Sequence, residues 1–114
     1  MNNFGVNFYE TSSGRKIISD FINSFSHVQI TKIHNDLDLL KDYGLKLLNT
    51  PLVKKIYKKP SIYELRIKTK VEIRLLFYFH KPKNFVVLHG FIKKTNKTPR
   101  KDIELALKRL REFI

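Results

Sequence analysis

Three stretches of sequence decide the fold of this chain: IYELRIK at residues 62–68, VEIRLLFYFH at 71–80 and NFVVLHGFI at 84–92. The first two alternate apolar and polar side chains, which is the period of a half-buried β-strand. The third is almost continuously apolar, which is typical of a strand covered on both faces. Because only short segments separate the three, we predict an antiparallel meander whose third strand lies in the interior of the sheet.

One further strand and three helices are predicted around this meander. Residues 4–9 alternate and indicate a first strand, and apolar residues at helical spacing predict helices over 13–24, 26–44 and 98–114. The order of elements is therefore β-α-α-β-β-β-α. This order predicts an α+β domain, with a small twisted antiparallel sheet flanked by helices.

The ends of two of these helices carry typical capping sequences. Ser26 and Gln29 have the spacing of a capping box, and Gly44 fits the left-handed residue that stops a helix. Thr98 followed by Pro99 fits a helix start in which the threonine is the N-cap.

The length and composition of the chain predict a single domain, residues 1–114. The chain has 42% hydrophobic side chains, enough for a core, and no cysteine for a disulfide or a thiolate metal site. We therefore expect a reducing, cytoplasmic location. The first residues lack the regions of a signal peptide, and no apolar run approaches the roughly 20 residues that span a bilayer.

The net charge of +13 comes from 23 basic and 10 acidic residues, and it is unevenly distributed. An A/T-rich coding sequence would also produce many lysines, but it would spread them along the chain. Residues 1–50 contain five basic and five acidic side chains, so the whole net charge falls in residues 51–114. Such a basic half is typical of proteins that bind a polyanion. The one basic helix needs its apolar face for the core, which favours nucleic acid over a membrane surface.

Strand parity gathers part of this charge on one face of the sheet. A three-residue loop at 68–70 sets Arg66 across from Glu72 and Glu64 across from Arg74. The expected solvent-exposed face bears Glu64, Arg66, Arg74, Tyr78, His89, Phe91 and Lys93. Arginine binds phosphate through paired N–H groups, and aromatic rings stack on unpaired bases. The set therefore predicts an RNA-binding surface; taken singly, its charged residues also fit ordinary cross-strand ion pairs.

Several of these residues form a pattern that resembles a known family. The segment Tyr63-Glu64-Leu65-Arg66, then Arg74, then HGFIKKTNKTP at residues 89–99 and a helix containing Ala106 and Arg109 closely resemble the phage-derived, HigB-like branch of the RelE/ParE toxin superfamily. The resemblance covers nearly the whole chain. Its most specific part is the Phe-x-Lys-Lys-Thr-x-Lys-Thr-Pro run from Phe91 to Pro99.

The resemblance implies a RelE-like fold and a function. The implied protein is the toxin of a type II toxin–antitoxin system, a ribosome-dependent mRNA endonuclease (mRNA interferase). In such enzymes the 2′-hydroxyl of the substrate attacks the adjacent phosphate without a metal or another cofactor. The implied partners are a cognate antitoxin, often a helix-turn-helix protein, together with the ribosome and mRNA. Operator DNA is contacted only through the antitoxin, and no membrane is involved.

The resemblance also implies roles for individual residues. Arg66 and Arg74 match basic strand residues of the active site, and Lys93 or Lys94 matches a basic residue that contacts the scissile phosphate. The general base stays open among His89, Glu64 and one of these two lysines. The residues expected to bind RNA around this centre are Lys54, Lys55, Lys68, Tyr78, Phe91 and Lys97.

Other functions fit the sequence less closely. A toxin of the ParE type shares the fold and inhibits DNA gyrase by binding it, and a non-catalytic nucleic-acid-binding module would also be basic. A metal-dependent nuclease needs clustered carboxylates, of which the basic half has few. The four histidines, at positions 27, 34, 80 and 89, show no metal-ligand spacing.

Overall fold

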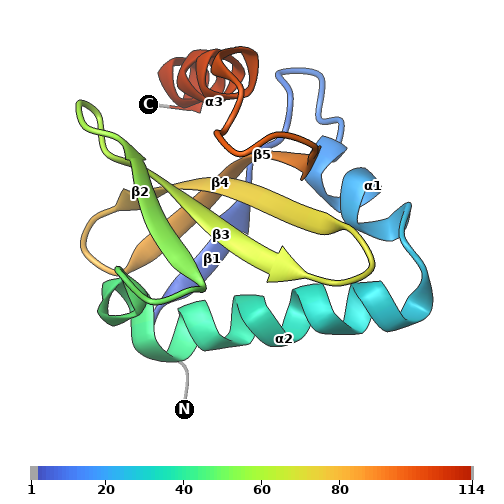
Figure 1. Ribbon diagram of the computed structural model, residues 1–114. Helices are drawn as coiled ribbons and strands as arrows, with labels where there is room; N and C mark the ends of the chain where they lie inside the picture. Colours follow the sequence, from blue (N-terminus) through green and yellow to red (C-terminus); the bar gives the residue numbers. More distant parts are fainter. Residues whose placement is uncertain (1–2, 114) are drawn as a thin grey trace.

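The computed structural model describes residues 3–113 and confirms the predicted α+β class (Figure 1). The elements are β1 (Gly5–Phe8), α1 (Ile17–Asn23), α2 (His27–Tyr43), the 3-10 turn η1 (Gly44–Leu47), β2 (Val53–Tyr57), β3 (Ile62–Lys68), β4 (Glu72–His80), β5 (Asn84–Lys93) and α3 (Arg100–Phe113). Their order matches the predicted one, with β2 as an additional strand. The three strands of the meander end within one residue of their predicted limits.

The five strands form one mixed sheet in the order β1-β5-β4-β3-β2. Neighbours from β2 to β5 are antiparallel, whereas β1 runs parallel to β5 and pairs with its residues 84–87. The expectation of a purely antiparallel sheet was therefore wrong, because alternation along a strand does not reveal the direction of its neighbour. β5 lies inside the sheet as predicted, and its residues 85–88 have no exposed surface.

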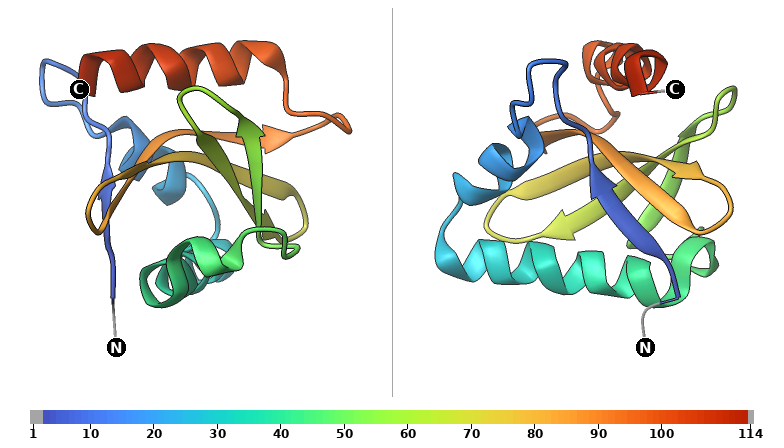
Figure 2. Two further views of the ribbon diagram at one scale, coloured as in Figure 1. Left: turned by 90° about the vertical axis from the view of Figure 1, so that its left-hand side faces the viewer. Right: turned by 180° about the vertical axis from the view of Figure 1, so that it is seen from behind.

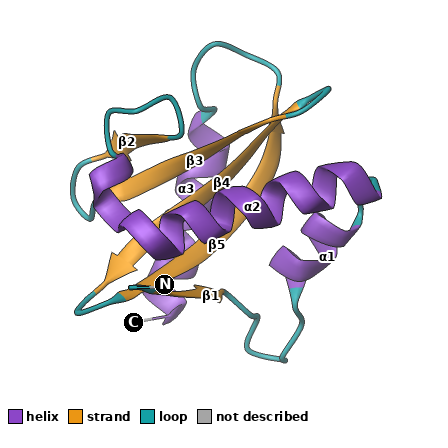
Figure 3. Ribbon diagram, turned by 90° about the horizontal axis from the view of Figure 1, so that it is seen from below, coloured by secondary structure: helices purple, strands orange, loops and turns teal. Residues whose placement is uncertain are grey.

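Helices cover both faces of the sheet. In Figures 1 and 2, α2 lies against one face and α3 against the other, and Figure 3 shows α1 beside α2 on the same side. The side chains of α2 that enter the core are Ile33, Leu37 and Leu40. On the opposite layer, Ala106 and Leu110 of α3 are buried. The basic half of the sequence therefore forms α3 and every strand but β1, whereas α1 and α2 come from the first half, which has no net charge.

The predicted helix ends are partly confirmed. Ser26 and Gln29 form both hydrogen bonds of the capping box, and Gly44 ends α2 at a φ of 58°. α1 begins at Ile17 rather than at 13, because residues 11–14 form a turn closed by the Gly14 N–H and the Thr11 carbonyl, 2.8 Å apart. α3 begins at Arg100, and the preceding threonine directs its hydroxyl elsewhere, as described below.

The β3–β4 hairpin has a different register from the predicted one. Its three-residue loop is 69–71, so Arg66 lies directly opposite Arg74 rather than opposite Glu72. The Thr69 hydroxyl donates a hydrogen bond to the Val71 carbonyl at 2.8 Å, which stabilises the turn at this position. The faces of the two strands are unchanged, because both loops have three residues.

A β-bulge divides β5 at Leu88. His89 pairs with Leu76, but the next pair along the ladder joins Val87 to Phe77. Strict alternation would place Phe85 and Val87 on the same face as Arg66. Because of the bulge they point instead to the opposite face, into the aromatic core. The residues from His89 to Lys93 keep the predicted face.

Candidate functional site

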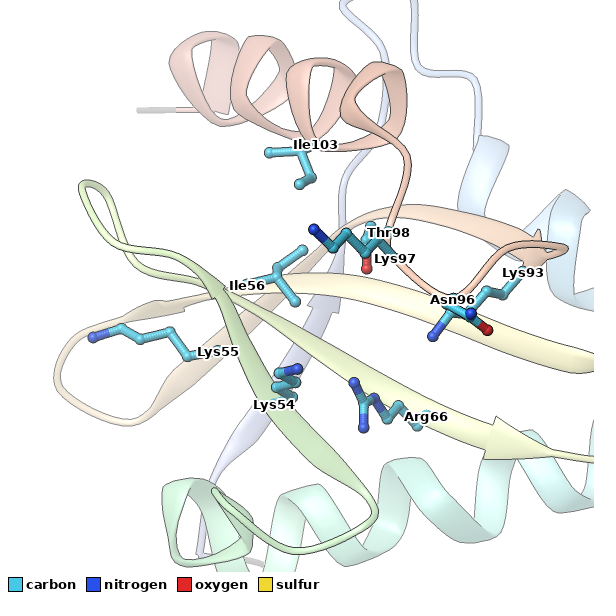
Figure 4. A pocket seen from close by; sticks show the side chains of 9 residues that line it. All are labelled: Lys54, Lys55, Ile56, Arg66, Lys93, Asn96, Lys97, Thr98 and Ile103. Atoms are coloured by element: carbon cyan, nitrogen blue, oxygen red, sulfur yellow. The ribbon is translucent and has the colours of Figure 1, made fainter.

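A basic cleft of about 360 Å³ opens beside the edge of the sheet (Figure 4). It lies between strands β2 and β3 on one side and the segment that joins β5 to α3 on the other. The residues that line it are Lys54, Lys55, Ile56, Arg66, Lys93, Asn96, Lys97, Thr98 and Ile103. Five of the expected site residues are therefore brought together here: Arg66, Lys93, Lys97, Lys54 and Lys55.

The lining of the cleft is strongly cationic. It includes four lysines and one arginine, and among the described residues no carboxylate lines it. Lys54, Lys55 and Lys97 are exposed, whereas Arg66 and Lys93 are half-buried. Cations that converge from a sheet and a loop raise the local concentration of anions and bind phosphate oxygens. The cleft is thus suited to a phosphodiester backbone.

Arg66 is held in place by a carboxylate beneath the cleft floor. Glu64 has no exposed surface, and its Oε1 accepts a hydrogen bond from the Nε of Arg66 at 3.1 Å. The Nε of Arg74 lies 3.5 Å from the same oxygen. The other oxygen, Oε2, accepts a hydrogen bond from the Thr98 hydroxyl at 2.5 Å. Glu64 therefore joins β3 to β4 and to the loop that carries Lys97.

The position of Arg74 corrects the expectation of a solvent-exposed face. Arg74 is 2% exposed and does not line the cleft. It lies between the buried Glu64 and the exposed Glu72, whose Oε1 accepts from its Nη2 at 2.5 Å. The hydrogen bond and the charge of Arg74 lower the pKa of Glu72. Parity placed these side chains on the correct face, but α3 and the preceding loop cover it, so Arg74 supports the site from below.

His89 joins the sheet to α3 and lies outside the cleft. Its Nε2 is 2.7 Å from Oδ1 of Asp102, and its Nδ1 is 3.2 Å from Nη1 of Arg109, which also donates to the Leu88 carbonyl at 2.9 Å. Burial lowers the pKa of His89, although the bond to Asp102 raises it. Both ring nitrogens of His89 are therefore engaged in contacts with α3, and the residue does not line the cleft.

The guanidinium of Arg109 extends this polar link toward the first strand. It lies 5.5 Å from the centre of the Tyr9 ring, and the Tyr9 hydroxyl donates to Glu112. Sequence reasoning did not assign Asp102 a role and used Arg109 only for the family resemblance. Their spacing of seven residues, which returns to the same helix face as the buried Ala106, was the signal that could have identified them.

The remaining expected site residues lie elsewhere. Lys94 follows the last residue of β5 and lines a different pocket from the one that Lys93 lines. Phe91 lines that pocket too, and its ring stacks on the ring of His89 with 5.6 Å between the ring centres. Lys68 borders a separate depression of about 190 Å³, which it shares with Arg66. Tyr78 lies four residues beyond Arg74 on β4 and packs beside His80.

In the part of the chain described, residues 3–113, no helix has both the length and the apolar character needed to cross a bilayer. The same residues contain no group of three or more histidines or carboxylates placed to hold a metal ion.

Comparison with known proteins places the chain in a family. The family model described as phage-derived protein Gp49-like matches residues 20–111, which run from α1 to the last turns of α3 and include every residue of the cleft. No curated protein matches the sequence significantly. Since the matched segment is most of the chain, this protein belongs to the family of phage-derived Gp49-like proteins.

Proposed function

We propose that this protein is the toxin of a type II toxin–antitoxin system and that it cleaves mRNA on the ribosome. The observation that carries the proposal is the basic cleft, in which Arg66 is fixed by a fully buried carboxylate while lysines from three segments surround it. Membership of the Gp49-like family and the motifs shared with HigB-like toxins support the assignment to the RelE/ParE superfamily.

The proposed reaction is an internal transfer within the RNA. The 2′-oxygen of one nucleotide attacks the adjacent phosphorus, an O2′–P bond forms and the P–O5′ bond breaks. One proton leaves the 2′-hydroxyl, and one reaches the departing 5′-oxygen. The products are a 2′,3′-cyclic phosphate and a free 5′-hydroxyl, and the balance of atoms requires no metal.

The cleft residues would act mainly by electrostatic stabilisation. Negative charge builds up on the non-bridging phosphate oxygens in the transition state, and cations fixed in advance stabilise it most effectively. Arg66 uses its Nε for Glu64, so its two Nη amino groups remain for the phosphate. Lys54 and Lys97 approach the same space from β2 and from the loop.

Proton transfer in this scheme falls to a lysine. Glu64 and His89 are engaged in the contacts described above, and the ionisable groups that line the cleft are basic. We assign the role to Lys93, because it is less exposed than the other cleft lysines and ends a strand. A group held on a strand is positioned more accurately than one on a loop.

The proposal includes a partner. A cognate antitoxin would silence the enzyme most directly by placing acidic side chains over the cleft, where exposed Lys54, Lys55 and Lys97 offer charge complementarity.

Expression in a host that lacks the antitoxin tests the activity. We expect growth arrest and new mRNA 5′ ends that carry hydroxyl groups, with matching 2′,3′-cyclic phosphates on the upstream fragments. Arg66→Ala and Lys93→Ala should abolish both effects, whereas Lys81→Ala, in the exposed β4–β5 turn, should leave them intact. Growth arrest with intact mRNA would overturn the nuclease assignment and favour a toxin that binds gyrase.

A further inference from the structure

A second pocket of about 440 Å³ lies on the opposite side of the loop from the cleft. It is bounded by α1, the end of β5 and the start of α3. β1 pairs with β5 only at residues 84–87, so the later part of β5 has its edge toward this pocket.

The pocket combines apolar walls, a basic rim and one buried carboxylate. Phe21, Phe91 and Ile92 supply apolar surface, and Ile92 is 39% exposed. Lys94 and Lys101 are exposed at the rim. A slot with aromatic walls beside cations is the usual receptor for an unpaired nucleobase and its phosphate.

Asp102 gives this slot a hydrogen-bond acceptor of fixed position. The residue is 8% exposed and lines the pocket. His89 holds one of its oxygens, Oδ1, at 2.7 Å, and 12% of the side chain remains exposed. The carboxylate is therefore held in position by His89, and part of it faces the pocket.

The pocket and the cleft share the segment that joins β5 to α3, and neighbouring residues of this segment line one or the other. Lys93 lines the cleft and Lys94, the next residue, lines the pocket. The loop that follows has Lys97 on the cleft and Thr95 on the pocket. An RNA strand that crosses the segment between the cleft and the pocket can thus place a phosphate in the cleft and a neighbouring base in the pocket.

We propose that the second pocket binds a guanine base of the RNA strand, next to the phosphate that is cleaved. This inference rests on the proposed function, since it takes the cleft as the site of cleavage. Guanine presents two adjacent donors, its ring N–H and its amino group, to a carboxylate. Uracil presents one N–H flanked by two carbonyl oxygens, which a carboxylate repels. Asp102 would therefore set the base preference of the enzyme.

Binding of RNA that cannot be cleaved tests the pocket separately from catalysis. The probes are 2′-O-methyl tetrauridylate and the four versions that carry one guanine, each with a fluorescent label for anisotropy. The methyl group removes the attacking hydroxyl. We expect one guanine position to tighten binding to the wild-type chain by about tenfold, within the range of a paired hydrogen-bond contact to a base.

Variants then assign the preference to one residue. Asp102→Asn should abolish the guanine preference, whereas Glu104→Gln removes an exposed carboxylate from the same helix, outside the pocket, and should retain it. If Asp102→Asn does not fold, Ile92→Glu fills the pocket from an exposed position and should abolish the preference too. Equal binding of all five probes, or a preference that survives these variants, would overturn the inference.

Mapping cleavage sites in cells separates the two proposals. If mRNA is cleaved without regard to the bases beside the cut, the nuclease stands and the guanine pocket is wrong. The opposite result is also possible: no mRNA is cleaved, yet the wild-type chain prefers guanine in the binding assay and Asp102→Asn does not. In that case the pocket stands as an RNA-binding site and the proposed activity is wrong.

Discussion

Glu64 and Arg66 lie two residues apart on β3, and the Nε of the arginine is 3.1 Å from a carboxylate that has no exposed surface. A buried carboxylate is costly unless cations and hydrogen bonds surround it. Here Arg74 and Thr98 complete that surrounding. The cation at the centre of the cleft is therefore fixed from the interior of the protein, and the loop above the cleft is attached to the same anchor.

Replacing this anchor should weaken both the fold and the cleft. Glu64→Gln retains the shape but leaves Arg74 buried without its closest internal countercharge, so we expect a loss of about 3 kcal/mol in the free energy of unfolding, measured by urea denaturation. Glu72→Gln is the matched control, because Glu72 also contacts Arg74 but its side chain is 55% exposed. It should change stability little. Equal losses in the two variants would contradict the anchoring role.

RNA binding should depend on salt in proportion to the cleft cations that contact phosphate. For single-stranded RNA, each contact contributes about −0.7 to the slope of log K against log salt. Lys97→Ala should therefore reduce the slope by about 0.7, and Lys81→Ala, outside the cleft, should leave it unchanged. Anisotropy titrations with an uncleavable oligonucleotide at several salt concentrations measure both slopes. An unchanged slope in Lys97→Ala would place the RNA elsewhere.

Stability should fall on the acid side of neutrality because of His89. Burial lowers the pKa of this histidine below the usual 6.5, so the unfolded chain takes up a proton at a pH where the folded chain does not. The contribution of the neutral His89 to the free energy of unfolding is therefore fully present above pH 6.5. It is lost as the pH falls below that value, by at most about 1.4 kcal/mol per pH unit.

The variant His89→Gln isolates this effect. Glutamine can still donate a hydrogen bond to Asp102 but does not titrate. Urea midpoints at pH 8 and pH 5.5 should differ less in the variant than in the wild type. If both proteins lose the same stability between these pH values, other groups cause the acid sensitivity.

Gly90 should be sensitive to the addition of a single methyl group. A Cβ at this position would lie 2.5 Å from the Phe21 ring and 3.0 Å from Leu75, so Gly90→Ala forces the Phe21 ring, or α1 with it, to move. We expect a loss of about 1–3 kcal/mol, as for other overpacked cores. Gly90→Ala should cost less stability when it is introduced into a Phe21→Ala background than into the wild type. A double-mutant cycle by chemical denaturation measures this coupling. Additive losses would contradict the contact.

Much of the fold could be predicted from periodicity, and its failures have physical causes. β3 and β4 were found because their apolar and polar side chains alternate, and β5 because its sequence is almost continuously apolar. β2 was missed because its sequence, VKKIY, contains one fully buried residue, Val53, and two exposed lysines. The hairpin register differed because two loops of equal length preserve the same faces and differ only in cross-strand partners.

The site was predicted in part for a similar reason. Parity assigns side chains to a face of the sheet, and it correctly put Arg66 and Lys93 together. It does not report what covers that face. Because α3 and its preceding loop fold over one end, Arg74 and Glu64 became buried, and the histidine joined the helix instead of the cleft.

The attachment of Thr98 to Glu64 has a consequence for synthesis of the chain. Polypeptides emerge from the ribosome N-terminal end first, and contacts between distant segments form late. A nascent chain that ends before Lys93 already contains Glu64 and Arg66, yet it has neither the far wall of the cleft nor the hydroxyl that completes the anchor. The ribosome that makes this protein therefore carries a chain with an incomplete cleft until residues 93–103 emerge, and assembly of the cleft is among the last events of folding.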